Sequence, residues 1–311
     1  MTRRFFALLN HRDVVLLLAI ASGLLFGRHS RFLGDISVGI LTLIMVFSTI
    51  GFSFRDWVPF RIPLRQIATA ILLNYVVFGT VVCLLAALLP DRGDYQAVRI
   101  GLWLIAAAPA GPSIVAFTTL LKGNVSYSVN GVFGITLAAV VVIPFVFFLL
   151  PDTGPVSPAL LLPMLIKLII LPLILSRFLR HPKVLPLIKP VQPTVVKWGF
   201  FMVIVPTIGL SRDVIFSEPW LVASVAGIFL VAIYGLALVY YFLTRSFKPP
   251  NVIISGILLT VIKSSAFSAV LAISFFSDPV VALPSAVLSV FVTTFYITFS
   301  IFSRYFLSPG R

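Results

Sequence analysis

One charged side chain stands in the middle of a long apolar stretch of this sequence. Lys263, within VIKSSAFSAV (261–270), lies roughly 13 residues from either end of the apolar run 251–276. At about 1.5 Å per helical residue its ammonium is roughly 19 Å from each end, too far to snorkel to an interface. A charge at the bilayer centre costs about 2.5 to 3.5 kcal/mol on insertion scales, so such residues usually face a protein interior or a cavity. Lys263 is therefore predicted to lie on a substrate or ion pathway.

The residues after Lys263 predict an interruption of the helix. The last carbonyls of a helix carry partial negative charge, so an ammonium is favoured there. Ser264 or Ser265 would then cap the amides of the second half. Three roles for Lys263 stay open. In the first it is a structural tether that neutralises the ends of the broken helix. In the second its charge attracts an anionic substrate or changes protonation during transport, and in the third it is a neutral amine that faces lipid.

A second interruption is predicted in APAGPS (108–113). Pro109 and Pro112 lack an amide hydrogen, and Gly111 tolerates unusual dihedral angles. An ordinary kinked helix is the alternative. Because the two interruptions occupy matching positions in the two halves of the chain, we assign Pro109, Gly111, Pro112 and Ser113 to the predicted pathway.

The composition indicates an all-α polytopic membrane protein. The 311 residues are 60% hydrophobic and 10% charged, with a mean hydropathy of +1.14, whereas soluble domains carry roughly 25% charge. Apolar stretches of about 20 residues, the length that crosses a bilayer, recur along the whole chain. Ten transmembrane helices are expected, at 14–27, 36–54, 66–89, 97–121, 125–150, 159–178, 192–210, 219–243, 250–276 and 279–306.

Several classes of function do not fit this sequence. The net charge of +14 is spread singly over short loops, which favours membrane orientation over nucleic-acid binding. Cys83 is the only cysteine, so an intramolecular disulfide is impossible and a thiol metal site is not expected. Walker motifs and catalytic-triad signatures are absent. We therefore expect neither an enzyme nor a bound cofactor or metal.

The ten spans divide into two sets of five, with the interrupted span fourth in each set. An odd number of spans per half means that structural repeats must be inserted with opposite orientation, as in many secondary transporters. The expected units are a first inverted repeat at 1–150 and a second at 151–311.

The distribution of Lys and Arg predicts the orientation. With both termini in the cytoplasm, cytoplasmic segments carry fifteen of these residues and external segments carry five. The positive-inside rule favours this arrangement.

Four segments of the chain resemble one known family. APAGPSIVAFTTLLKGNVSYSV (108–129) is similar to a pattern of Pro-Gly-Gly-Thr-Ala-Ser-Asn followed by Lys-Gly-Asn-Val-x-x-Ser-Val. LIMVFSTIGFSFRDW (43–57), LPMLIKLIILPL (162–173) and FFSDPVVALPSAVLSV (275–290) match further segments of the same family. The sequence thus resembles a bacterial member of the bile acid:sodium symporter (BASS) family along nearly its whole length. The resemblance implies an inner-membrane protein with core and panel domains, in which broken helices four and nine cross at mid-membrane near the sodium and substrate sites.

The positions that hold sodium ligands in this family carry mostly apolar residues here. The replaced positions are Ile114, Val115, Val132 and Leu259. Leu259 stands where the family has its glutamate, and Lys263 stands where it has a glutamine. Because sodium needs several oxygen ligands, both family sodium sites are predicted to be lost.

A few polar residues remain at or near those positions. Ser128 is retained, and Asn74 replaces a family glutamine. Asn130 is a further polar residue in an apolar span, and we include it among the candidate pathway residues. Lys197, near the start of its span, is expected to snorkel.

The sequence predicts a sodium-independent secondary transporter that moves a small or amphipathic organic anion by alternating access. In this hypothesis Lys263 supplies the positive charge that sodium brings in relatives. The expected partners are the organic anion, the lipid bilayer and, in a proton-coupled variant, protons. A carrier similar to cation/proton antiporters that uses Lys263, and a non-transporting membrane sensor or scaffold, are the alternatives.

Overall fold

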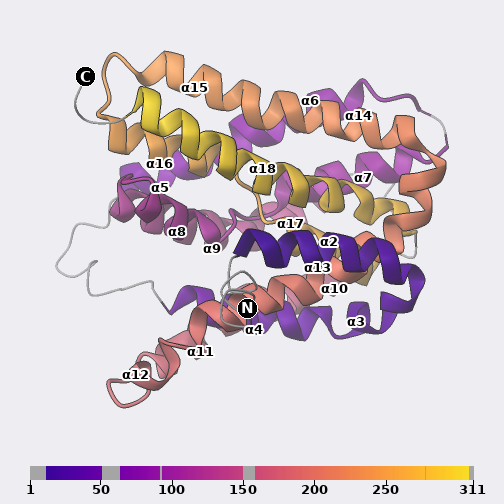
Figure 1. Ribbon diagram of the computed structural model, residues 1–311, viewed down its shortest axis with the longest axis horizontal. Coiled ribbons are helices and arrows are strands. Elements are labelled where there is room, and N and C mark those ends of the chain that lie inside the picture. Colours follow the sequence, from indigo (N-terminus) through magenta and orange to yellow (C-terminus); the bar gives the residue numbers. More distant parts are fainter. Residues whose placement is uncertain (1–11, 51–63, 92, 150–157, 277, 308–311) are drawn as a thin grey trace, which may run out of the picture.

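The fold is all-helical in the part of the chain that the structure describes. This structure is a computed structural model, and it describes residues 12–50, 64–91, 93–149, 158–276 and 278–307. The longer helices run along the long axis of the molecule (Figure 1).

The helices of the first half follow the predicted spans closely. They are α2 (Arg12–Phe26), η1 (Gly27–Ser30), α3 (Arg31–Asp35), α4 (Ser37–Thr49), α5 (Leu64–Ile71), the π-helical segment η3 (Leu72–Phe78), α6 (Gly79–Ala87), α7 (Tyr95–Ala107), α8 (Ser113–Leu120) and α9 (Val125–Leu149). Between α7 and α8 the chain leaves the helical conformation, at the predicted break.

The second half also contains one interrupted helix. Its elements are α10 (Pro158–Leu165), the π segment η4 (Ile166–Ile170), α11 (Leu171–Leu179), α12 (Leu185–Ile188), α13 (Gln192–Ser217), α14 (Pro219–Phe229), the π segment η5 (Leu230–Gly235), α15 (Leu236–Thr244), α16 (Pro250–Val261), α17 (Ser265–Phe275), η6 (Pro279–Ala282) and α18 (Leu283–Phe306). The second predicted break lies between α16 and α17.

Six helices in the described residues are long and apolar enough to cross a membrane. They are Leu64–Ala87, Val125–Leu149, Leu161–Leu179, Gln192–Ser217, Pro219–Thr244 and Pro279–Phe306. The remaining predicted spans coincide with shorter apolar helices: α2, α4 and the two interrupted pairs. Residues 51–54 of the second predicted span lie outside the described residues.

One predicted boundary is wrong. The span expected at 192–210 continues as helix α13 to Ser217, through Arg212 and Asp213. Hydropathy detects the apolar part of a helix, whereas backbone hydrogen bonding continues through charged residues until the chain turns. The helix ends only at Glu218, which leaves the helical conformation before Pro219.

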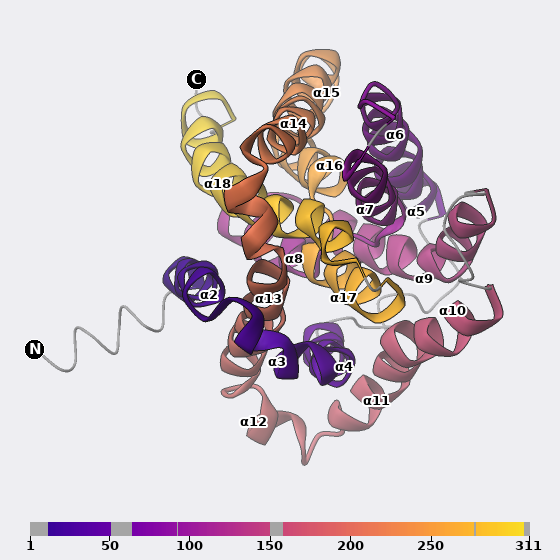
Figure 2. The same cartoon turned by 90° about the vertical axis from the view of Figure 1, so that its right-hand side faces the viewer.

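The helices pack in two groups that meet along one interface. The first group contains α2, α3, α4, α10, α11 and α13, and the second contains α5 to α9 and α14 to α18 (Figure 2). The two groups meet where α13 contacts α17 and α18, and where α10 contacts α9. Both interrupted helices belong to the second group, close to this interface.

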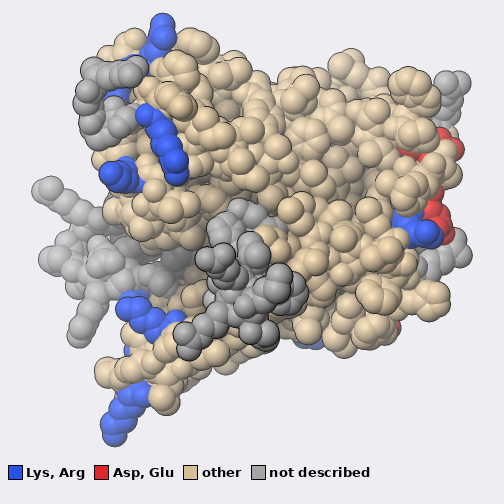
Figure 3. All heavy atoms as spheres, viewed as in Figure 1, with Lys and Arg blue, Asp and Glu red and all other residues tan. Residues whose placement is uncertain are grey.

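Charged side chains gather at the ends of the molecule. On the face drawn in Figure 3, an uncharged band separates an end dominated by Lys and Arg from an end that carries Asp and Glu. Many large apolar side chains along the helices between those ends are exposed, including Leu84, Val141 and Phe148. An exposed apolar band between two polar ends is the surface expected of a protein embedded in a bilayer.

Candidate functional site

The two helix interruptions lie in direct contact. Ala108 after α7 and Ile262 after α16 both have extended backbone conformations. The two extended segments pair in antiparallel fashion, with Ala110 opposite Lys263. The Ser264 amide donates a hydrogen bond of 2.9 Å to the Pro109 carbonyl. The residues predicted to break the two helices therefore form one crossing, at which four helix ends meet.

The Lys263 ammonium is enclosed by hydrogen-bond acceptors. Nζ donates to Asn74 Oδ1 at 2.8 Å, to the Ala106 carbonyl at 2.9 Å and to the Ala108 carbonyl at 2.9 Å. An ammonium has three donors and a neutral amine has only two, so these contacts fit the protonated form. Lys263 is 1% exposed, which rules out the lipid-facing arrangement.

The carbonyls that bind Lys263 come from the other broken helix. Ala106 lies in the last turn of α7 and Ala108 is its C-cap. A helix C-terminus carries partial negative charge that favours a cation. The expectation that an ammonium lies beside unpaired carbonyls of the broken helices is confirmed, and the carbonyls it contacts belong to α7. The side chain crosses from the end of α16 to α7, and this contact joins the two broken helices.

Two aromatic rings complete the enclosure of the ammonium. Lys263 Nζ lies 4.3 Å from the centre of the Tyr75 ring and 5.6 Å from that of Phe78, within the range of cation–π attraction. The Tyr75 hydroxyl donates to the Ile135 carbonyl at 2.9 Å, which holds the ring in place. Sequence reasoning missed both aromatics. The available signal in the sequence was that Tyr75 and Phe78 follow Asn74 by one and four positions, close enough along the chain to lie near the same site.

Asn74 connects the lysine to α16. Its Oδ1 accepts from Lys263, while its Nδ2 donates to the Leu259 carbonyl at 2.9 Å. Asn74 is fully buried on the π-helical segment η3, and π segments occur frequently at functional sites. The amide thus has both of its polar atoms engaged at the crossing.

The serines after Lys263 begin the second half of the broken helix. Ser264 is the N-cap of α17, and its Oγ accepts from the Phe267 amide at 3.3 Å. Ser265 is the first residue of that helix. The expected cap is therefore present, and it is provided by Ser264.

The other side of the crossing is apolar. Ile114, Val132 and Leu259 are at most 1% exposed and lie in one hydrophobic cluster, with the partly buried Val115 packed against it. A Cβ added to Gly131 would lie 2.8 Å from both δ carbons of Leu259, so the leucine fills the space beside α9. These four residues, which the sequence comparison predicted at lost sodium-ligand positions, form a packed hydrocarbon region.

Ser128 and Asn130 do not contact Lys263. Ser128 Oγ shares a hydrogen bond of 2.7 Å with Thr118 Oγ1. Asn130 Nδ2 donates to Gln66 Oε1 at 3.2 Å, between α9 and α5. Asn130 thus connects two helices of the second group by a hydrogen bond. Of the polar side chains predicted at the crossing, only Asn74 reaches the lysine.

Lys197 also differs from expectation. It is 8% exposed on α13, so it does not snorkel into the solvent. Helix α13 packs against α2, α4 and α18. A position near the start of an apolar run therefore did not predict exposure.

A small cavity of about 30 Å³ separates the crossing from the first helix group. Hydroxyls of Ser113, Ser265, Ser289 and Thr293 line it, together with Gly111, Pro112, Lys263 and Ser264, and Leu16, Phe200 and Ile204 close the opposite wall. This volume suffices for a water molecule but not for an organic solute. The N-termini of α8 and α17 both begin at this cavity, and helix N-termini favour anions.

Tyr296 of α18 borders this region and was also missed from the sequence. Its hydroxyl lies 3.0 Å from Ser113 Oγ. Its ring stacks on Phe117, with centres 3.4 Å apart. Tyr296 thereby connects α18 to the start of α8, the shorter half of the first broken helix.

An apolar helical protein with two broken helices that cross at a buried site belongs to the class of polytopic membrane proteins with discontinuous helices. The family model that matches is the Sodium Bile acid symporter family, over residues 38–218, more than half of the chain. This chain belongs to that family, which consists of membrane transporters and not of enzymes. No curated protein matches the sequence.

Proposed function

We propose that this chain is a secondary transporter of a small or amphipathic organic anion that works without bound sodium. The observation that carries the proposal is the enclosure of the Lys263 ammonium by Asn74 and the Ala106 and Ala108 carbonyls. Carbonyl and amide oxygens are also the ligands that a sodium ion needs. In this proposal Lys263 is a covalently attached cation that joins the two broken helices.

The proposal of two inverted repeats, at 1–150 and 151–311, is supported by the pattern of helix contacts. Helix α2 of the first half packs on α13 of the second, and α11 of the second half packs on α4 of the first. These are the first span of each half against the second span of the other. The contacts of α5 with α9 and of α6 with α7 likewise recur as those of α14 with α18 and of α15 with α16. A two-fold relation between the halves produces this exchange.

The two helix groups then correspond to the panel and core domains that the resemblance implies. The core carries the crossing, and the panel closes the cavity beside it through residues such as Phe200 and Ile204. In alternating access, relative movement of these groups would open the cavity toward each side in turn. The 30 Å³ cavity corresponds in this proposal to a closed state.

An anionic substrate fits the charges at the crossing. Lys263 neutralises the C-terminus of α7, while the N-termini of α8 and α17 remain uncompensated at the cavity. No carboxylate lines this cavity in the described part of the chain. The remaining field is positive, and it favours a carboxylate or a similar anion held by hydroxyls such as those of Ser113 and Ser265.

The absence of a carboxylate among the described residues that line the cavity at the crossing argues against a carrier of the cation/proton antiporter type. Such carriers generally use a carboxylate within the membrane. Among the described residues, Asp35, Asp213 and Asp278 line a cavity of about 500 Å³ at one end of the molecule, not the crossing.

We also propose that both termini face the cytoplasm of a bacterial inner membrane, because the end rich in Lys and Arg would then face inward.

Flux into proteoliposomes tests this function. Purified protein is reconstituted, and uptake of labelled short-chain and amphipathic carboxylates is measured in sodium and in potassium at equal ionic strength. We expect saturable uptake of at least one carboxylate, equal in the two salts. Uptake that requires sodium would contradict the role of Lys263, and absence of flux for every anion would favour a sensor or scaffold.

A further inference from the structure

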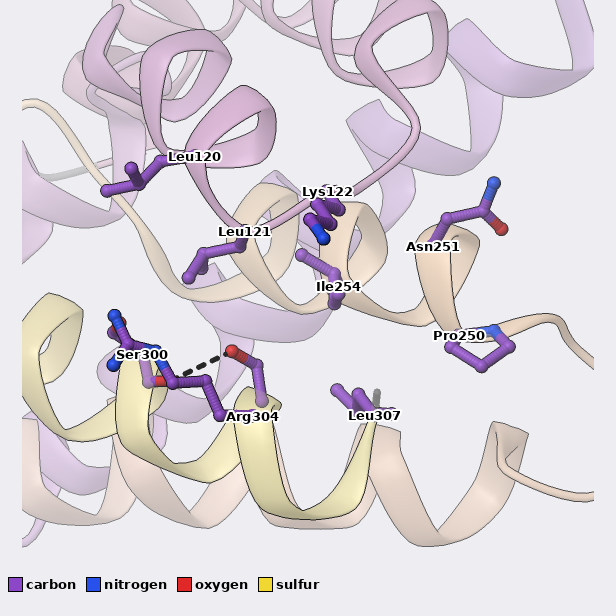
Figure 4. Close-up of a pocket in the computed structure, with 10 residues that line it drawn as sticks. Leu120, Leu121, Lys122, Pro250, Asn251, Ile254, Ser300, Arg304 and Leu307 are labelled. Carbon is purple, nitrogen blue, oxygen red and sulfur yellow. Dashed lines mark hydrogen bonds between the residues drawn. The ribbon is translucent and has the colours of Figure 1, made fainter. Parts of the chain in front are cut away.

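A cavity of about 620 Å³ lies away from the crossing, at the end of the molecule where Lys and Arg gather (Figure 4). Its walls are the C-terminal end of α8, the first turn of α16 and the last turns of α18. All three belong to the second helix group. The cavity is therefore separate from the interface between the groups, where the transport site is proposed.

Two cations stand on different walls of this cavity, and none of the described residues that line it carries a carboxylate. Lys122 follows α8, and Arg304 lies in the last turn of α18. Both side chains are exposed, and among the described residues neither forms a hydrogen bond or an ion pair. Two positive charges around an open cavity, with no counter-ion from the part of the chain that the structure describes, predict an anionic ligand.

The backbone at Lys122 is unusual. Its φ is +58°, and it is the only non-glycine residue with positive φ in the described part of the chain. The left-handed position after a helix normally carries Gly, because a side chain there is strained. Gly123 follows directly, yet it does not adopt positive φ. Strain kept at a residue that points its charge at a cavity indicates a binding role.

Capping of helix ends by cations is the simpler explanation, and it covers only part of the observations. Arg304 in the last turn of α18 does interact favourably with the C-terminus of that helix. This interaction with the helix dipole of α18 explains neither the presence of the cavity nor the strained backbone of Lys122. The N-terminus of α16 opens on the same cavity at Pro250 and Asn251, and it adds partial positive charge.

We propose that this cavity, lined by Lys122, Asn251 and Arg304, binds the head group of an anionic phospholipid. Leu120, Leu121, Ile254 and Leu307 form the apolar part of the lining, so the cavity matches a phosphate that is attached to an apolar chain. Leu120 is 71% exposed and Phe306 is 63% exposed, which continues the apolar surface from the cavity toward the bilayer. The Arg304 guanidinium would bind a phosphodiester through two parallel hydrogen bonds.

Thermal unfolding in lipid tests this site. The unfolding temperature is measured in detergent micelles that contain phosphatidylcholine and again after addition of phosphatidylglycerol. Glycerol phosphate provides a soluble anion without acyl chains. We expect phosphatidylglycerol to raise the unfolding temperature of the wild type, and K122Q/R304Q to lose at least half of that shift. The matched control is K183Q/K189Q, which removes the same charge from exposed lysines near α12 and should keep the full shift.

A single variant separates binding from folding. Lys122→Gly relieves the strained backbone, so we expect it to unfold at a higher temperature than the wild type in phosphatidylcholine. It should nevertheless respond less to phosphatidylglycerol. Equal responses of K122Q/R304Q and K183Q/K189Q would overturn the site, as would an undiminished response of Lys122→Gly. An equal shift with glycerol phosphate would overturn the assignment to lipid.

Discussion

The two sides of the helix crossing are filled by different kinds of side chain, a hydrogen-bonded ammonium on one side and hydrocarbon on the other. On one side the Lys263 ammonium contacts Asn74 and the carbonyls at the end of α7. On the other side the side chains of Leu259, Ile114 and Val132 are buried in one hydrophobic cluster. Lys263 lies four positions after Leu259, so the last turn of α16 and the segment that follows it carry both kinds of side chain.

The difference follows from the backbone. At the first side, the broken helix α7 leaves carbonyls that need a donor or a cation, and burying them unsatisfied is costly. At the second side, α8 and α9 keep their helical hydrogen bonds, and only side chains meet. A cation is therefore needed where main-chain oxygens are exposed, whereas hydrocarbon suffices where they are not.

Removal of the cation should have the largest effect. Lys263→Ala leaves the Ala106 and Ala108 carbonyls and Asn74 Oδ1 without a donor in a closed site. Loss of one partner from a buried charged network typically costs about 3 to 5 kcal/mol, and we expect transport to be lost with it. Chemical denaturation in mild detergent and proteoliposome flux measure the two effects.

The control for this variant is Lys248→Ala. Lys248 also donates to a side chain, the Tyr240 hydroxyl at 3.2 Å, but it is only part-buried at that contact. We expect it to change stability by less than about 1 kcal/mol. Full flux and full stability of Lys263→Ala would show that the lysine is incidental.

Truncation of a side chain on the apolar side should destabilise the folded protein and leave its unfolding temperature equal in sodium and in potassium. Leu259→Ala removes a fully buried side chain, and such a cavity typically costs about 2 to 5 kcal/mol. The unfolding free energy reports the loss. The unfolding temperature of this variant in sodium and in potassium should stay equal, because a cavity lined by methyl groups offers no ligand. A sodium-specific shift would show that ligands remain there.

Overpacking of the same region should cost less. Gly131→Ala places a Cβ 2.8 Å from the Leu259 δ carbons and 3.0 Å from Ala70 Cβ, and we expect a loss of about 1 to 3 kcal/mol. The double variant with Leu259→Ala should recover part of that loss, since the truncated side chain makes room. Additive losses in this double-mutant cycle would contradict the packing described here.

The smallest expected effect concerns the aromatic wall of the cation side. Tyr75→Phe keeps the ring over the ammonium but removes the hydroxyl that donates to the Ile135 carbonyl. Loss of one such hydrogen bond costs about 0.5 to 1.5 kcal/mol, and flux should persist. Tyr75→Leu also removes the ring, so it should reduce stability further. Equal losses for the two variants would show that the cation–π contact contributes nothing.

Much of this comparison was predictable from the sequence. The unusual residues at 109–113 and 263–265 identified both breaks, because Pro, Gly and a lone charge in apolar spans leave few alternatives. The family resemblance, which the match over residues 38–218 confirms, placed Asn74 and Ser128 among the polar candidates for the site, and Asn74 contacts Lys263. The sequence also predicted a hydrogen-bonding cap after the lysine, and Ser264 provides it.

The details of the contacts were not predictable in the same way. Which carbonyls receive the ammonium depends on how α7 and α16 cross, and a long side chain reaches acceptors that sequence distance does not reveal. The burial of Lys197 was not predicted, because a polar residue in an apolar span has no pattern that states which neighbour it faces. Tyr75 contributes through its position on the π segment η3, whose altered turn shifts side chains relative to a regular helix.

The central claim is that Lys263 takes the place of a bound sodium ion, and a sodium titration of thermal stability tests it most directly. The unfolding temperature is followed in sodium for the wild type and for K263Q/L259E, with potassium at equal ionic strength as the control. The double variant carries the two residues that the proposed alignment with the family places at these positions. We predict no sodium-specific shift for the wild type and a saturable increase for the double variant. A saturable increase specific to sodium in the wild type would contradict the account.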